Sequence, residues 1–137
     1  MMKKTDLCPC ASKKIYADCC QRFWATQQVA ATAEELMRSR YTAFVLEKAA
    51  YLLETHHSQS RKPDELKALK KSFKGMVWTG LEIVATQAGA ETDSEGEVEF
   101  VAHFKHVGKA GRLHERSRFN KEKGQWFYVD GDILSDA

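Results

Sequence analysis

Residues 97–119 read EVEFVAHFKHVGKAGRLHERSRF, and in this segment apolar and polar side chains alternate in two runs that are separated by glycines. Alternation with a period of two is the pattern of a β-strand that buries one face. Glycines between two such runs supply the turn that reverses the chain. The segment therefore predicts two consecutive antiparallel strands, 98–104 and 113–121, and makes a sheet the centre of the fold.

The same alternation continues on both sides of this strand pair. Apolar residues alternate over 81–85, and a fourth run covers 125–131. The stretches 89–96, 108–111 and 123–124 contain glycines and are the expected connections. We therefore expect a four-stranded antiparallel meander in the second half of the chain.

Helical spacing precedes the sheet. Thr32 is followed three residues later by Glu35, which forms a capping box at the start of a helix predicted over 33–47. A second helical stretch is expected over 48–55, and Pro63 opens a third short helix. Helices followed by antiparallel strands predict an α+β fold in which the helices pack on one face of a curved sheet.

The overall composition sets broad limits. The 137 residues are 43% hydrophobic, which is enough for one conventional core and therefore one main domain. Lys and Arg number 21 against 19 Asp and Glu, so the formal net charge of +2 does not point to nucleic acid as the main ligand. No apolar run suits a signal peptide or a membrane span. We therefore expect a soluble cytoplasmic protein.

All four cysteines lie in the segment CPCASKKIYADCC, residues 8–20. Cys8 and Cys10 occupy a tight turn, and Cys19 and Cys20 follow one short loop later, so four thiolates can close around one ion. Zinc accepts four thiolates tetrahedrally, and a shell of four cysteines leaves no open position for a substrate. We therefore predict a structural Zn²⁺ site. The alternatives are a redox dithiol, including a vicinal Cys19–Cys20 pair, and four cysteines without a shared role.

The first part of the chain holds few apolar side chains and depends on the metal for its order. We expect a zinc knuckle over 1–21 and the α+β domain over 22–137, with few residues shared by the metal site and the core. Loss of the metal is then expected to disorder about the first 20 residues and to leave the sheet intact. On the same reasoning, 22–137 folds alone.

The cysteine segment resembles the SEC-C motif, the zinc-binding tail of the SecA translocation ATPase. That motif reads Cys-Pro-Cys-Gly-Ser-Gly-Lys-Lys-Tyr-Lys-x-Cys-(Cys or His). The sequence departs from it at Ala11 and Lys13, where the motif has glycines, and at Ile15, where it has lysine. Besides the four cysteines, the match includes Pro9, Ser12, Lys14 and Tyr16.

The rest of the chain resembles the YchJ-like proteins of bacteria, which join a SEC-C motif to a domain similar to the cystatin-like cone of the nuclear transport factor 2 superfamily. The resemblance implies a nuclear transport factor 2-like α+β cone and a metal, without implying a reaction. Many of these proteins bear a second SEC-C motif at the C-terminus. This sequence shows none up to Ala137, so we expect no function that needs two. The segments that carry the resemblance are LMRSRYTAFVLEKAAYLLETHH (36–57), WTGLEI (78–83), HERSRF (114–119) and GQWFYVDG (124–131).

The third strand carries polar residues in an apolar row, where Glu115 and Ser117 alternate with Leu113 and Phe119. If this row faces the inside of the cone, Glu115 is a buried acid, either paired for stability or tuned for proton transfer. Arg40 lies on the apolar face of the first predicted helix, where a buried cation needs an anion. We expect a bidentate ion pair between Arg40 and Glu115.

Our first functional hypothesis is a non-enzymatic adaptor that docks on a protein partner through the knuckle. Its resemblance to the SecA tail implies contact with a secretion chaperone or the ribosome. An acidic or RNA-bearing partner is favoured by the basic residues around the cysteines, which are Lys3, Lys4, Lys13 and Lys14.

The second hypothesis is a small-molecule-binding protein or an enzyme that uses the cavity of the cone. Glu115 is then the acid or base, and Arg40, Ser117 or Asp130 orients the ligand. An adaptor requires an exposed knuckle and a filled cone, whereas an enzyme requires an open cone with several convergent polar groups. A homodimer through the exposed sheet is an option under either hypothesis.

Overall fold

The structure is a computed structural model that describes residues 2–134. The last three residues of the predicted domain, 135–137, lie outside this range. Two short 3₁₀ helices and four α-helices precede the sheet, in the order η1 (Tyr16–Asp18), α1 (Gln21–Ala25), α2 (Ala33–Val45), α3 (Ala49–Glu54), η2 (Ser58–Ser60) and α4 (Glu65–Ser72).

Four antiparallel strands follow in the spatial order β1-β2-β3-β4, as the alternating pattern predicts. β1 begins five residues before the predicted 81–85 run, because the ladder to β2 continues to the pair Met76 and His106. In the centre of the sheet, Phe100 of β2 lies opposite Glu115 of β3. The strands are β1 (Met76–Ala88), β2 (Glu95–His106), β3 (Lys109–Glu122) and β4 (Gln125–Ile133).

The start of α2 is fixed by the predicted capping interaction. The Thr32 hydroxyl oxygen accepts a hydrogen bond from the backbone N–H of Glu35 at 3.1 Å. The helix ends at Val45, two residues earlier than predicted, because Glu47 adopts a left-handed conformation with φ 59°. This reversal allows α3 to begin at Ala49 and pack against α2.

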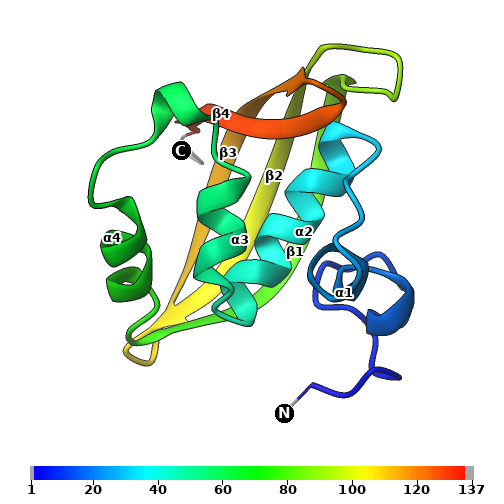
Figure 1. The fold of residues 1–137 in the computed structure, drawn as a ribbon. Helices are drawn as coiled ribbons and strands as arrows, with labels where there is room; N and C mark the ends of the chain where they lie inside the picture. Colours follow the sequence, from blue (N-terminus) through cyan, green and yellow to red (C-terminus); the bar gives the residue numbers. More distant parts are fainter. Residues whose placement is uncertain (1, 135–137) are drawn as a thin grey trace.

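The helices cover one face of the curved sheet, with α2 and α3 lying across it and α4 beside α3 (Figure 1). Leu36, Met37 and Tyr41 of α2 are buried in one cluster with side chains of the sheet, which include Val98 and Phe119. This arrangement confirms the predicted α+β fold with helices packed on a curved antiparallel sheet. Within residues 2–134, none of the helices is both long and apolar enough to cross a membrane.

The cysteine segment is part of this core, so the expectation that the metal site and the core share few residues is wrong. The segment lies against α2, on the side away from α4 (Figure 1). Its cysteines and Tyr16 belong to the same buried cluster as Phe23, Leu36 and Met37. Residues 2–21 therefore do not pack as a unit separate from the rest, because α2 packs against both the cysteine segment and the sheet.

Candidate metal centre

A short antiparallel pairing shapes the first half of the centre. The backbone N–H of Cys8 donates to the carbonyl of Lys14 at 2.8 Å, and Leu7 and Ile15 form a β-bridge. Neighbouring residues in such a pairing point to opposite faces. Cys8 and Tyr16 are therefore buried, while Leu7 and Ile15 are exposed.

The turn between the paired segments contains two residues in the left-handed region, Ala11 with φ 64° and Lys13 with φ 70°. These are the two positions at which the SEC-C pattern has glycine. Glycine adopts positive φ without the steric penalty that a Cβ atom imposes. The left-handed conformation at positions 11 and 13 therefore costs more free energy with Ala11 and Lys13 than it would with the glycines of the motif.

We expect Lys13→Gly to stabilise the protein, because it removes a left-handed strain of about 1 kcal/mol. The side chain of Lys13 is exposed, so few contacts are lost. Thermal unfolding of the metal-loaded protein measures the effect. The matched control is Lys14→Gly, since Lys14 is also exposed but is not among the residues with positive φ. An equal or lower melting temperature for Lys13→Gly than for Lys14→Gly would contradict the argument.

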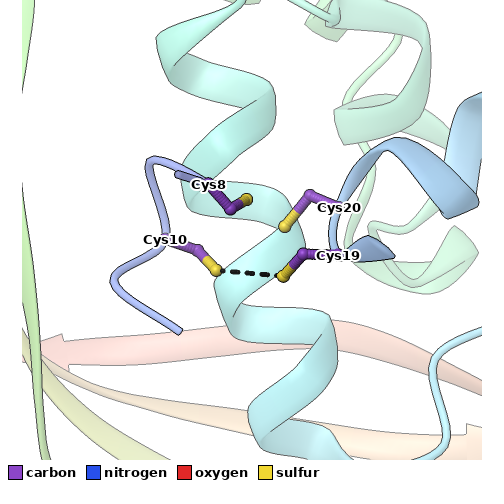
Figure 2. Close-up of side chains that lie close together, drawn as sticks. All are labelled: Cys8, Cys10, Cys19 and Cys20. Atoms are coloured by element: carbon purple, nitrogen blue, oxygen red, sulfur yellow. Dashed lines mark hydrogen bonds between the residues drawn. The ribbon is translucent and has the colours of Figure 1, made fainter. Parts of the chain in front are cut away.

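Cys19 and Cys20 approach from the other side, in the turn between η1 and α1. Adjacent residues in a strand would point their sulfurs in opposite directions. Here Cys19 ends η1 with φ −124° and ψ −116°, and Cys20 precedes α1 with φ −66°. Because neither is in a strand, both sulfurs point toward those of Cys8 and Cys10, and α2 runs alongside (Figure 2).

The four sulfur atoms all lie within 4.8 Å of one another, and the Sγ atoms of Cys10 and Cys19 are 3.5 Å apart. A metal bound tetrahedrally at the usual Zn–S distance of 2.3 Å would separate its sulfurs by about 3.8 Å. All four cysteines are buried and none is in a disulfide. The cluster therefore fits a four-coordinate metal ion, and sulfurs that converge this closely do not support four cysteines without a shared role.

Thiols packed so closely affect one another's protonation. The pKa of Cys8 is lowered because the thiols of Cys10 and Cys20 donate hydrogen bonds to its sulfur. The pKa of Cys20 is raised because its proton is held between Cys10 and Cys8 and because it is buried. Four buried thiolates require a compensating cation. A bound metal ion would supply that charge.

Groups outside the cysteines support the cluster. The Ser12 hydroxyl oxygen lies 3.1 Å from Sγ of Cys19, and Oγ1 of Thr42 lies 3.7 Å from Sγ of Cys8. Nη1 of Arg38 donates to the carbonyl oxygen of Cys10 at 2.5 Å. Such outer contacts hold the ligands of a metal in place. Neither Arg38 nor Thr42 was predicted as a site residue, and their one signal in the sequence is that two polar residues four positions apart share a face of α2.

Arg40 is buried, with 9% of its surface exposed, but it does not form the predicted ion pair. Nη1 donates to the carbonyl of Leu52 at 2.8 Å and to the hydroxyl of Thr55 at 2.6 Å. The guanidinium also stacks over the ring of Tyr128, with Cζ 4.7 Å from the centroid. Burial lowers the pKa of Arg40 to about 10.

Glu115 and Ser117 do share the inner face of β3, as predicted, but Glu115 bonds to neutral groups. Ser117 donates to the Glu115 carboxylate at 2.5 Å, and the Tyr128 hydroxyl donates to the same oxygen at 3.4 Å. Among the described residues, Glu115 has no ion pair. Its carboxylate lies against Gly131, where any Cβ atom would collide with it. Tyr128 therefore lies between Arg40 and Glu115.

Asp130 is on the opposite face of the sheet and cannot orient a ligand inside the cone. Its carboxylate pairs with Nε of Arg118 at 2.5 Å, and both side chains are exposed. The cause is a bulge: Phe119 pairs with Tyr128 and Arg118 with Asp130, so Val129 is left over. The extra residue places Tyr128 inside and Asp130 outside.

We expect Glu115→Gln to cost less than about 1 kcal/mol of unfolding free energy, because the amide can still accept from Ser117 and Tyr128. Breaking a buried ion pair with Arg40 would instead cost about 3 to 5 kcal/mol. Denaturant unfolding distinguishes the two values. Arg116→Ala, which removes an exposed partner of Glu99, is the control for an ordinary surface ion pair. A loss above about 3 kcal/mol in Glu115→Gln would restore the predicted pair.

The cone does contain a cavity, with a volume of about 510 Å³. Its wall is formed by α2, by the end of α4 and by β1 to β3, and is mostly apolar. Arg40, Glu115, Ser117 and Asp130 are not part of this wall. The enzyme hypothesis needs these four residues to converge on the cavity, and they do not.

Known proteins share both parts of the chain. Residues 5–22 match the SEC-C motif, and residues 32–131 match the family described as YchJ, middle NTF2-like domain. A UPF0225 protein of Bordetella pertussis is 48% identical over 128 residues, which cover 92% of each chain. A UPF0225 protein of an Enterobacter species is 46% identical over 127 residues, covering 93% of this chain and 83% of the other.

Two solved structures are similar over nearly the whole chain. A SEC-C motif containing protein from Rhodopseudomonas palustris is 32% identical, with a TM-score of 0.84, and the match covers 93% of this chain and 98% of the other. A SEC-C motif containing protein from Psychrobacter arcticus is 30% identical, with a TM-score of 0.75, covering 98% and 86%. The chain therefore belongs to the UPF0225 family and joins a SEC-C motif to a YchJ middle NTF2-like domain.

Proposed function

We propose that the protein is a cytoplasmic zinc-binding adaptor, in which one Zn²⁺ ion is held by Cys8, Cys10, Cys19 and Cys20. The observation that carries the metal is the convergence of four buried sulfurs within 4.8 Å of one another. Four thiolates favour zinc and leave no coordination site for a substrate, so the role of the ion is structural. Reduced cysteines in this number suit the reducing cytoplasm.

The adaptor role is supported by the outer face of the same segment. Leu7 is 64% exposed and Ile15 is 36% exposed, and the β-bridge holds them side by side. Lys13 and Lys14 are exposed beside Ile15, and Lys4 is exposed near Leu7 in the chain. We call Leu7, Ile15, Lys4, Lys13 and Lys14 the knuckle face. An apolar pair on a surface where these lysines outnumber the exposed Asp6 suits a partner that offers an apolar contact surrounded by negative charge.

The partner class follows from this chemistry together with the resemblance to the SecA tail. A ribosome and an acidic secretion chaperone both present negative charge, and both are contacts implied by that resemblance. Binding to either should weaken as salt rises, because exposed lysines act through screened charges. The metal acts indirectly, since it fixes the turn that brings Leu7 and Ile15 together.

The test is co-sedimentation of the zinc-loaded protein with ribosomes, together with a binding titration against a purified secretion chaperone. We expect the double variant Leu7→Glu and Ile15→Glu to lose binding. Val107→Glu is the matched control, because Val107 is 80% exposed and lies in the β2–β3 turn, away from the knuckle face. Equal binding by all three proteins, or binding by none to either partner, would refute the proposed role.

A further inference from the structure

The cavity of the cone has the dimensions and wall of a ligand site. Its volume of about 510 Å³ lies within the range of small-molecule pockets. Aromatic side chains dominate the wall: Tyr41 and Phe44 come from α2, and Trp78, Phe100 and Phe104 come from the sheet. Such a wall favours an apolar ligand body, since it offers burial without hydrogen-bonding partners.

Polar side chains occur where the wall is formed by Ser72, at the end of α4, and by His106, at the end of β2. Ser72 and His106 lie at the same end of the molecule. His106 pairs with Met76 at the start of β1, and the α4–β1 junction lies beside the β2–β3 turn (Figure 1). Val107 in that turn lies 3.1 Å from the position of a Cβ atom on Gly75. A ligand with one polar end would place it here.

This end of the molecule is basic. Residues 66–81 and 100–114, which meet there, contain no Asp or Glu. Lys109 lies directly opposite His106 in the ladder, so their side chains share the face that lines the cavity. Lys74 lies between Ser72 and Met76, both of which line the cavity. Across residues 2–134, Lys74, His106 and Lys109 have no side-chain hydrogen bond or ion pair.

The neighbouring acid in the α2–α3 connection, Glu47, is not among the residues that line the cavity. Glu47 lines a separate groove together with Lys70. We therefore leave Lys70 out and define the basic rim as Lys74, His106 and Lys109. An apolar cavity with a rim of one sign selects ligands by charge as well as by shape.

We propose that the cavity binds an anionic amphiphile of the fatty-acid class, with its apolar chain among the aromatic side chains and its carboxylate at the basic rim. A carboxylate there can accept hydrogen bonds from the rim lysines and from His106, which are charge-assisted. The site is separate from the metal centre and from the knuckle face, so its test does not depend on the adaptor role.

The test is isothermal titration of the zinc-loaded full chain with dodecanoate and with dodecyltrimethylammonium, which has the same chain and the opposite charge. We expect dodecanoate to bind with one-to-one stoichiometry and the cation to bind at least about tenfold more weakly. Equal affinity for both would show only non-specific hydrophobic binding and would overturn the proposal.

Two charge reversals in one hairpin locate the head group. Lys109→Glu should weaken dodecanoate binding about tenfold or more, because it brings a negative charge to the rim. Lys105→Glu is the matched control: Lys105 is next to His106 in the strand, so its side chain points to the other face. Its affinity should equal that of the wild type, and equal effects of the two changes would refute the assigned rim.

A third change tests the cavity itself. Met76→Trp adds bulk at a half-buried wall position and should abolish dodecanoate binding, while thermal melting and zinc content confirm that the variant is folded. Retained affinity in this variant would place the ligand elsewhere.

A membrane surface is the other source of an anionic amphiphile, and co-sedimentation of the protein with vesicles of anionic phospholipid tests it. Binding to vesicles without binding of free dodecanoate would replace the proposal with a membrane contact.

Discussion

Removal of the metal is expected to abolish the cooperative unfolding transition of the whole chain. Binding of structural zinc contributes about 10 kcal/mol or more in small zinc peptides, whereas an entire domain is stable by about 5 to 15 kcal/mol. Because the four cysteines share a buried cluster with Phe23, Leu36 and Met37, their loss reaches the core. This outcome differs from the sequence-based expectation, in which only the first 20 residues become disordered.

Differential scanning calorimetry with and without a chelator measures the effect, and Cys10→Ser provides the genetic equivalent because Cys10 is fully buried. Ser12→Ala is the matched control: it removes a hydroxyl 3.1 Å from Cys19 but leaves four thiolates. We expect this control to keep its metal and to lose about 1 kcal/mol or less. An unchanged transition after chelation of the wild type would contradict the account.

Deletion of residues 1–21 should be similarly damaging. The deletion removes the cysteines and Tyr16 from the buried cluster and uncovers Thr42 on α2, whose hydroxyl contacts Cys8. It also takes away the acceptors of two hydrogen bonds, the Cys10 carbonyl from Arg38 and the Tyr16 hydroxyl from the indole of Trp24. Exposure of a core face of this kind costs several kcal/mol, as with the loss of a large buried side chain.

Thermal melting followed by circular dichroism tests this prediction on the chain 22–137. A chain that begins at Lys4 is the control, because it is shortened at the same end but keeps every cysteine and the bond from Ala17 to the Lys4 carbonyl. We expect the control to melt like the full chain and the longer deletion to lose its cooperative transition. A stable, cooperative 22–137 fragment would show that the knuckle is an independent unit after all.

Much of the fold follows from local sequence patterns. The alternation in 97–119 reports a hairpin because each strand buries one face, and the capping residues Thr32 and Glu35 mark the start of α2 because they satisfy its free N–H groups. The four cysteines were identifiable as a group because the ligands of such a site lie close in the chain. None of these features depends on how distant segments meet.

The features that the sequence did not predict all depend on long-range geometry. Arg40 and Glu115 are both inside the cone, yet Tyr128 from a third element lies between them. Asp130 faces outward because one bulge in β4 reverses the alternation. The contact of Thr42 with Cys8 arises only when α2 is placed beside the knuckle. Register, bulges and packing partners carry no local signal.

The central claim is that four cysteine thiolates bind one zinc ion within the core. X-ray absorption at the zinc edge, together with elemental analysis of protein purified without chelator, tests it most directly. We expect one zinc per chain, surrounded by four sulfur atoms at about 2.3 Å. Protein without zinc, a disulfide among the cysteines, or a metal shell containing nitrogen or oxygen ligands would contradict the account.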